Sequence, residues 1–296
     1  MINVFYRKEQ TANVDVFSPS PRKPALVVDA WLKQFPDKIK INSFEPVTVE
    51  QLCAVHDKKG VLDILNCVKP NGFGTYDRAV ADSLPYTSGS LLAAAKHALE
   101  YGVAVSPTSG FHHSEHGSGK YHNGVFGGSM AQGFCTFNAL ALVAVDLLNT
   151  GKVSRVAVAD CDAHAGNGLE NIISVLGLRD KIKHFSAGYK YHNAYQANEF
   201  LTRLPRIIRT MEDCGLLMYQ AGADAWVDDP LGAGFLTKNQ LRERDQIVFE
   251  TCKEIGLPVC WCLAGGYSSN MQDILDIHNA TLEEGIKVYE SNVVYD

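Results

Sequence analysis

The chain has 296 residues, of which 46% are hydrophobic and 20% charged, and its formal net charge is −6 at pH 7. This composition excludes a disordered chain, and an acidic balance without a Lys/Arg block argues against a nucleic-acid-binding protein. The eight cysteines form no Cys-x-x-Cys pair, residues 1–8 become charged too early for a signal peptide, and no apolar run could span a bilayer. We therefore expect a cytoplasmic protein with free thiols and no membrane partner.

Short β-branched runs alternate with longer segments of helical periodicity, which predicts an α/β fold with a mostly parallel sheet and crossover helices. The expected strands are residues 4–6, 102–106, 155–159, 181–186, 216–220 and 258–263. The expected helices are residues 89–101, 138–148, 194–211, 238–255 and 271–289. Because no repeat, linker or low-complexity tract interrupts this pattern, we expect one domain over residues 1–296.

Polar and glycine-containing segments follow four of the expected strands. A His112-His113 pair follows the second strand, an Asp/His cluster at 160–167 the third, Asp224 the fifth and Ala-Gly-Gly-Tyr at 264–267 the sixth. Ligands of open parallel sheets bind beyond the carboxyl ends of the strands. We therefore expect these four segments to converge on one crevice.

The segment that follows residue 159 has the composition of a metal site. Alternation along an extended backbone would point Asp160, Asp162 and His164 to the same side, and Asp224 adds a carboxylate from another strand end. Carboxylates and an imidazole suit a divalent cation such as zinc, and three protein ligands with an open position are typical of catalytic zinc. A single Asp here would more often be a helix cap, but for the whole Asp-x-Asp-x-His-x-x-Asn string we put that alternative at about one in ten.

The tandem histidines and a later tyrosine are candidates for acid–base chemistry. A lone histidine is more often structural, but His112 and His113, adjacent on a glycine-containing loop, suit proton transfer at neutral pH. Tyr267 follows two glycines, which allow close backbone approach, and its hydroxyl could donate to a developing oxyanion. Glu115 and the histidines at 116 and 122 are interpreted as solvated loop residues.

At this point the chain resembles the zinc-dependent histone deacetylases and acetylpolyamine amidohydrolases, most of all the bacterial deacetylase-like amidohydrolases. The motifs occur in the family's order, and they are Gly-Phe-His-His (110–113), Gly-Phe-Cys-Thr-Phe-Asn (133–138), Asp-Cys-Asp-Ala-His (160–164), Gly-Ala-Asp (222–224), Asp-Asp-Pro-Leu-Gly (228–232) and Gly-Gly-Tyr (265–267). The resemblance runs from the first expected strand to the last helix. It implies the single-domain, three-layer arginase/deacetylase fold, with helices on both faces of the sheet.

The resemblance also implies a metal centre. One catalytic Zn²⁺ would be bound by Asp162, His164 and Asp224. The family's structural K⁺ site would fall near Asp160 and Ser186.

The same resemblance assigns roles to the catalytic side chains. His112 would be oriented by Asp160 and would supply electrostatic support, while His113, oriented by Asn167, would be the general base and then the acid for the leaving amine. Tyr267 would stabilise the oxyanion. Many members of the family carry Asp where Asn167 stands, so we expect the pKa of His113 to be raised less here than a carboxylate would raise it.

The substrate would enter a tunnel with Phe134 as one wall, next to Gly133, and with Gly265 near the reacting group. Tyr189 and Tyr191 are both candidates for the opposing wall. The scissile group would be the acyl-amide of acylated lysine, of an acylpolyamine or of another small acylamide, and these substrates are not distinguished by sequence. Association into a homo-oligomer is left open as well.

Two alternatives remain. A binuclear manganese ureohydrolase of the same fold would carry a bridging carboxylate two residues after the metal-ligating histidine, but Gly166 stands there, so we put this alternative at about one in twenty. A catalytically silent acyl-ligand-binding protein would be expected to have lost parts of the motif, yet all of them are present.

Overall fold

A parallel sheet forms the centre of the computed structural model, which describes residues 1–232 and 234–290. In this part of the chain the sheet has seven strands in the order β2-β1-β3-β9-β8-β6-β7, and every neighbouring pair is parallel. Its strands are β1 (Ile2–Phe5), β2 (Ile39–Asn42), β3 (Val103–Ser106), β6 (Val156–Asp160), β7 (Ile182–Ser186), β8 (Leu216–Gln220) and β9 (Val259–Cys262). The predicted α/β class with a mostly parallel sheet is confirmed.

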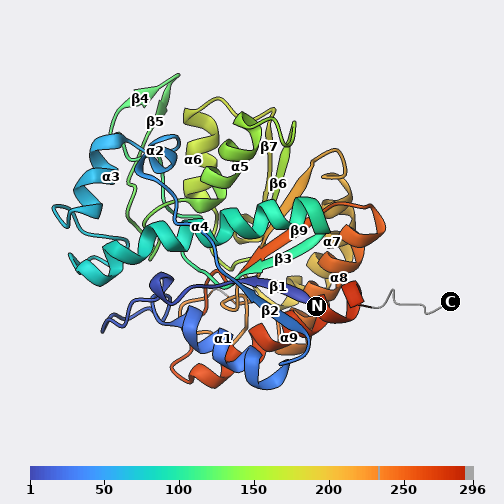
Figure 1. The fold of residues 1–296 in the computed structure, drawn as a ribbon. Helices are drawn as coiled ribbons and strands as arrows, with labels where there is room; N and C mark the ends of the chain where they lie inside the picture. Colours follow the sequence, from blue (N-terminus) through green and yellow to red (C-terminus); the bar gives the residue numbers. More distant parts are fainter. Residues whose placement is uncertain (233, 291–296) are drawn as a thin grey trace.

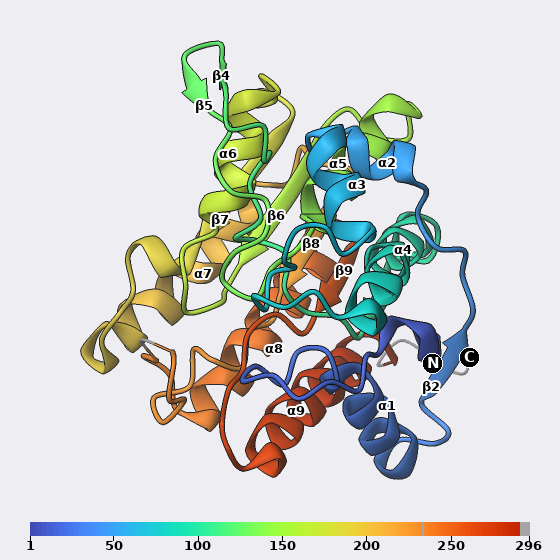
Figure 2. The same cartoon turned by 90° about the vertical axis from the view of Figure 1, so that its left-hand side faces the viewer.

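Helices cover both faces of this sheet (Figure 1). One face packs against α1 (Lys23–Gln34), α7 (Ala197–Arg209), α8 (Lys238–Glu254) and α9 (Met271–Glu290). The other packs against α2 (Val49–Cys53), α3 (Lys58–Leu65), α4 (Arg78–Tyr101), α5 (Ala139–Asn149) and α6 (Asn167–Val175). The antiparallel hairpin of β4 (Tyr121–His122) and β5 (Val125–Phe126) projects beside α6 (Figure 2).

The two cores follow from alternation along the strands. In β6, Ala157 and Ala159 belong to the core on the α7–α9 side, whereas Val156 and Val158 belong to the core under α4–α6. Buried on both faces, the central strands read as continuous apolar runs, which is the pattern of parallel sheets. Among the helices of the described residues, none is long and apolar enough to cross a membrane.

The carboxyl ends of four neighbouring strands lie in register. Ser106 pairs with Cys262, Cys262 with Gln220, and Gln220 with Asp160. The segments that leave β3, β9, β8 and β6 therefore start side by side at one edge of the sheet. This is the edge at which the sequence predicted a crevice.

The strand predictions were accurate to within two residues, but several elements were missed. The strand β2 and the helices α1, α2, α3 and α6 were not predicted, and α4 begins at Arg78 rather than residue 89. Asp77 caps α4 by accepting from the amides of residues 79 and 80, and Pro85 lies inside the helix. Gly89 packs so tightly that a Cβ would stand 2.6 Å from the Glu45 carbonyl oxygen. Tertiary packing thus overrides the helix-breaking residues that shortened the prediction.

Candidate active site

Three buried or half-buried side chains meet at the carboxyl edge of the sheet. Asp162 follows β6 and Asp224 follows β8, and their carboxylate oxygens and a ring nitrogen of His164 all lie within 4.8 Å of one another. Nδ1 of His164 is 3.0 Å from Asp224 Oδ2 and 3.2 Å from Asp162 Oδ1. The structure therefore brings together the three residues that were predicted as metal ligands.

The imidazole of His164 is oriented as a ligand. Its Nε2–H donates to the Leu231 carbonyl oxygen at 3.1 Å, so Nδ1, which faces the two carboxylates, is the nitrogen that would bind a metal after losing its proton. A hydrogen bond from the distal ring nitrogen to a carbonyl is the usual way in which a metal-ligating histidine is held in one tautomer.

The two carboxylates are held by backbone amides. Gly265 N–H donates to Asp162 Oδ2 at 2.7 Å, and Ala163 N–H donates to Asp224 Oδ1 at 3.1 Å. A Cβ on Gly265 would stand 1.9 Å from Asp224 Oδ2, so only glycine allows this approach. Gly265, predicted to contact substrate, thus contacts the carboxylates directly.

The charges of this group fit a divalent cation. Burial raises the pKa of Asp224, and the negative charge of Asp162 raises it further. Burial would also raise the pKa of Asp162, but the neighbouring His112 and His164 hold it well below its ordinary value. Hydrogen bonds to both carboxylates raise the pKa of His164 to about 11. In the absence of a metal, the cationic His164 ring offsets the charge of the buried carboxylates, and two oxygens with one imidazole nitrogen form a donor set suited to zinc.

Two histidine dyads stand next to the metal-ligand candidates. His112 and His113 have ring centroids 4.1 Å apart. Nδ1 of His112 is 2.7 Å from Asp160 Oδ2, and Nδ1 of His113 is 2.6 Å from Asn167 Oδ1. Each histidine therefore contacts the partner that the family resemblance implied.

The two dyads differ in charge. Burial lowers the pKa of His112, but the carboxylates of Asp160 and Asp162 outweigh it and raise the pKa to about 9. Burial and the neighbouring charge of His112 lower the pKa of His113 to about 4. At neutral pH the first ring is therefore cationic and the second is a neutral base. Environments that push two pKa values apart in this way mark separate roles in proton transfer.

Tyr267 closes the same site. Its backbone N–H donates to Asp229 Oδ2 at 2.7 Å, and its ring centroid lies 6.3 Å from that of His164. It lines a small cavity together with His112 and Asp162. Burial, together with the nearby carboxylates, raises the pKa of the Tyr267 hydroxyl, which therefore stays protonated and can donate.

The ring of Phe134 lies close to two further aromatic rings, one of which, Phe17, was not among the predicted tunnel residues. Its centroid is 6.2 Å from that of Phe17, which is 72% exposed, and 6.1 Å from that of Phe73. Phe134 has a positive φ of 61°, a conformation that non-glycine residues adopt mainly under local constraint. The preceding Gly133 packs so closely that a Cβ would stand 2.6 Å from Cδ2 of His113.

One candidate for the opposing tunnel wall is wrong. Tyr191 is 1% exposed and belongs to the core, where its ring centroid lies 5.0 Å from that of Phe200. Tyr189 is 55% exposed. It adjoins Gly188, where a Cβ would stand 2.1 Å from the His164 carbonyl carbon. Of the two tyrosines, only Tyr189 exposes its side chain to solvent, so it alone stays a candidate for the tunnel wall.

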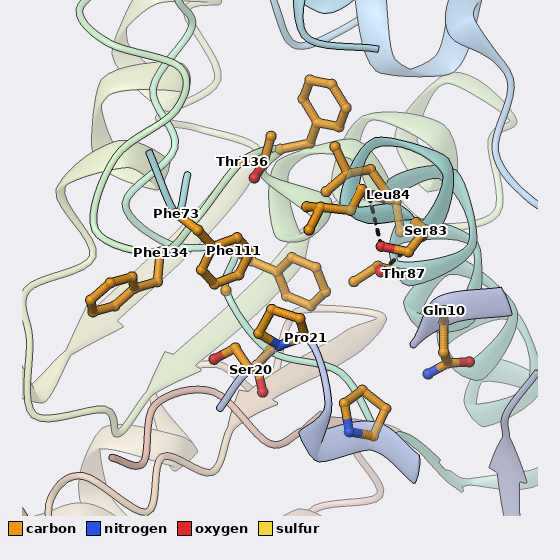
Figure 3. Close-up of a pocket in the computed structure, with 16 residues that line it drawn as sticks. Gln10, Ser20, Pro21, Phe73, Ser83, Leu84, Thr87, Phe111, Phe134 and Thr136 are labelled. Carbon is orange, nitrogen blue, oxygen red and sulfur yellow. Dashed lines mark hydrogen bonds between the residues drawn. The ribbon is translucent and has the colours of Figure 1, made fainter. Parts of the chain in front are cut away.

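A second small cavity adjoins Phe134. Figure 3 shows Phe73 and Phe134 on one side of it and the α4 residues Ser83, Leu84 and Thr87 on the other. Gly110 and Ser20 line both this cavity and the smaller one at Tyr267.

Glu115 is not the solvated loop residue that it was expected to be. Its carboxylate accepts from the side-chain amide of Asn167 at 3.2 Å and from the backbone N–H of Ser129 at 2.7 Å. The motif could not reveal this contact, because Glu115 and Asn167 are 52 positions apart. His122 does remain in the projecting hairpin, where its Nε2 lies 2.9 Å from the Ser118 hydroxyl oxygen.

Two buried cations near the metal-ligand loops were also missed. Arg244 is fully buried and donates to the carbonyl oxygens of Cys161 and Gly222, which precede the metal-ligand candidates on both loops. Lys23 is fully buried and donates to the Ala264 carbonyl oxygen at 2.5 Å. Burial lowers the pKa of Lys23 to about 8, although nearby carboxylates such as Asp224 oppose the shift. Arg244 falls inside the predicted helix 238–255, whereas Lys23 begins α1, which was not predicted.

A match to a protein-family model shows which family the chain belongs to. The histone deacetylase domain model matches residues 19–191 and 177–282 of the chain. The chain belongs to the histone deacetylase family. That family is metal-dependent, and the triad of residues 162, 164 and 224 is its candidate metal site here.

Individual relatives are distant. The chain is 26% identical over 226 residues to an uncharacterized protein of Picosynechococcus, with 68% of each chain covered. It is 26% identical over 207 residues to histone deacetylase 2 of Arabidopsis thaliana, covering 63% of this chain and half of that protein.

Solved structures support the fold. The HDA15 HD domain has a TM-score of 0.74 at 16% identity, covering 99% of this chain and 89% of that one. Acetylpolyamine aminohydrolase from Burkholderia pseudomallei has a TM-score of 0.70 at 16% identity, covering 96% and 98% of the two chains. The three-layer arginase/deacetylase fold implied by the sequence motifs is therefore confirmed.

Proposed function

We propose that the chain is a zinc-dependent deacetylase that removes acetyl or other acyl groups from a linear amide, such as acyl-lysine or an acylpolyamine. The observation that carries this proposal is the placement of Asp162, His164 and Asp224 within 4.8 Å, directly beside the His112–His113 pair. We further propose that residues 1–296 act as one catalytic domain holding one Zn²⁺. The eight free thiols favour a reducing compartment such as the cytoplasm.

In this proposal Asp162, His164 and Asp224 would hold a Zn²⁺ that would polarise the acyl carbonyl and lower the pKa of a water molecule. The oxygen of this water bonds to the carbonyl carbon as the water loses a proton. The neutral Nε2 of His113 takes a proton from that water and later passes it to the leaving nitrogen. The C–N bond breaks, and a carboxylic acid and an amine are released. A positioned histidine contributes about 10²–10⁴-fold to such a step. Cationic His112 and the hydroxyl of Tyr267 stabilise the developing negative charge.

The same segment could hold a structural K⁺, as the family resemblance implies. The Ser186 hydroxyl donates to Asp160 Oδ2 at 3.3 Å, so the two candidate residues lie together. We keep this ion as a proposal distinct from catalysis.

The surroundings of Gly166 argue against the binuclear manganese site of a ureohydrolase. A Cβ there would stand 2.6 Å from Asp160 Oδ2 and 2.9 Å from His184 Nε2, so a bridging carboxylate has no room. Within the described ranges, one group of three or more His, Cys, Asp and Glu side chains lies close enough to share a metal ion, and it has three members.

The proposal is tested by assaying the purified chain, loaded with Zn²⁺, on acetyl-lysine peptides, acetylated polyamines and analogues with longer acyl groups. We expect release of the free acid, loss of activity with a chelator, and recovery when Zn²⁺ is restored. Binding of these ligands without turnover would instead favour an acyl-ligand-binding protein. Two metal ions per chain with urea release from a guanidino substrate would favour a ureohydrolase.

The second dyad makes a separate prediction about pH. Asn167→Asp places a carboxylate against Nδ1 of His113, which favours the imidazolium and raises the pKa of that ring, by about one to three pH units for a close opposite charge. Because the base must be neutral to accept a proton, activity is lost as pH falls through that pKa. We therefore expect the acidic limb of kcat/KM against pH to move to higher pH. An unmoved limb would show that Asn167 does not set the basicity of His113.

A further inference from the structure

Glu115 reaches the catalytic histidine through the side chain of Asn167. Asn167 Oδ1 lies 2.6 Å from His113 Nδ1, and Asn167 Nδ2 donates to Glu115 Oε1 at 3.2 Å. A carboxylate can only accept hydrogen bonds, so the NH₂ group of the asparagine must face it. The amide oxygen then necessarily faces His113.

Glu115 is itself held at several points. Its Oε2 accepts the Ser129 backbone N–H at 2.7 Å, and its own backbone N–H donates to the Ser129 carbonyl oxygen at 3.1 Å. The buried ring of His56 donates from Nδ1 to the Glu115 carbonyl oxygen at 2.8 Å, because Nε2 accepts the N–H of Asn138. Gly128 leaves the space for the carboxylate, since a Cβ there would stand 1.5 Å from Oε2.

We propose that Glu115 is a positioning residue which, by fixing the orientation of the Asn167 amide, holds His113 in the tautomer with its proton on Nδ1 and its lone pair on Nε2. This inference rests on the proposed function, in which Nε2 accepts the proton of the attacking water. An asparagine alone offers a donor and an acceptor at nearly the same place and could present either to the ring. An Asp at position 167 would need no such help, because both of its oxygens accept.

A glutamine at position 115 separates this role from simple support of the loop. The Ser129 N–H still requires an acceptor, so the Oε1 of the new side chain must face it and the NH₂ must face Asn167. The amide of Asn167 then turns over, its Nδ2 faces His113, and the ring proton moves to Nε2. Glu115→Gln therefore keeps the hydrogen bond to the Ser129 N–H but reverses the direction of the two hydrogen bonds that link residue 115, Asn167 and His113. We call this chain of hydrogen bonds the relay.

The kinetic test is a double-mutant cycle on the Zn²⁺-loaded chain. In the natural background, Glu115→Gln should lower kcat by about 10–100-fold, the usual cost of losing an outer hydrogen-bond partner, with KM little changed. In an Asn167→Asp background the same change should cost nothing or improve kcat, because it removes one of two facing carboxylates. Glu199→Gln, at an exposed residue of α7, is the matched control. An equal loss in both backgrounds would reduce Glu115 to a loop support and overturn the inference.

The second readout needs no turnover. In the full metal-free chain labelled with ¹⁵N-histidine, long-range ¹H–¹⁵N NMR should show His113 protonated at Nδ1, and Glu115→Gln should shift the proton towards Nε2. An unchanged tautomer would refute the role of Glu115 even if hydrolysis is observed. If the tautomer changes but no amide is hydrolysed, the relay stands and the proposed reaction fails.

Discussion

Replacing Asp224 with asparagine is expected to abolish both metal binding and hydrolysis while leaving the fold intact. The new amide oxygen can still accept the Ala163 N–H that Oδ1 of Asp224 accepts at 3.1 Å. The amide NH₂ then takes the position of Oδ2, which lies 3.0 Å from His164 Nδ1, and donates to the lone pair that a metal would use. The substitution removes the anionic ligand at position 224, and the new NH₂ group occupies the His164 nitrogen that a metal would use. Loss of a residue that only hydrogen-bonds to a metal ligand lowers metal affinity by about 10–100-fold. Because Asp224 is itself a proposed ligand, the fall in Zn²⁺ affinity should be larger than this.

Calorimetric titration of the metal-free chain with Zn²⁺ measures this loss independently of any substrate. Asp213→Asn is a suitable control, because that carboxylate is 41% exposed and pairs with Arg155 and Lys183 at the surface. Exposed pairs of this kind contribute about 0–1 kcal/mol, so the control should bind Zn²⁺ and turn over normally. Undiminished activity in a metal-free Asp224→Asn chain would remove the basis of the proposed function.

The parts of the site that could be predicted from sequence are those encoded within a few residues of a strand end. Asp160, Asp162 and His164 follow one buried strand, and the parallel sheet brings the end of β8 beside it. Register along β6 and β8 therefore places Asp224 near the other two ligands without further information. The same argument located His112, because β3 lies two strands beyond β8, on the other side of β9, and ends at the same edge.

The remaining parts depend on contacts between segments that no local pattern connects. Phe17 and Phe73 reach Phe134 from two separate loops, and the pairing of Glu115 with Asn167 depends on how the 115–129 loop folds back. The prediction that Tyr191 could form the opposing tunnel wall was wrong for the same reason. After β7 the chain turns through residues 187–189, which directs that ring into the core rather than toward the site. Side-chain direction after an irregular turn is not contained in strand periodicity.

Replacing Tyr267 with phenylalanine is expected to lower kcat by about 10²–10³-fold, the typical cost of removing one oxyanion donor. The ring should keep its place, since it packs at 5.5 Å from Phe134 and the backbone N–H remains bound to Asp229. The raised pKa of the hydroxyl keeps it a proton donor across the working pH range, so the substitution removes a donor and not a charge. KM should change little, because the interaction strengthens mainly as negative charge develops on the oxygen.

The measurement has to separate a chemical role from a structural one. Zn²⁺ content and the midpoint of thermal unfolding should match those of the natural chain, because no carboxylate or backbone contact is altered. Tyr195→Phe is the matched control, since that tyrosine is 83% exposed and lies outside the site. A loss of metal together with activity would mean that Tyr267 supports the ligand loops instead. An unchanged kcat would assign oxyanion stabilisation to His112 alone, whose cationic ring lies in the same cavity.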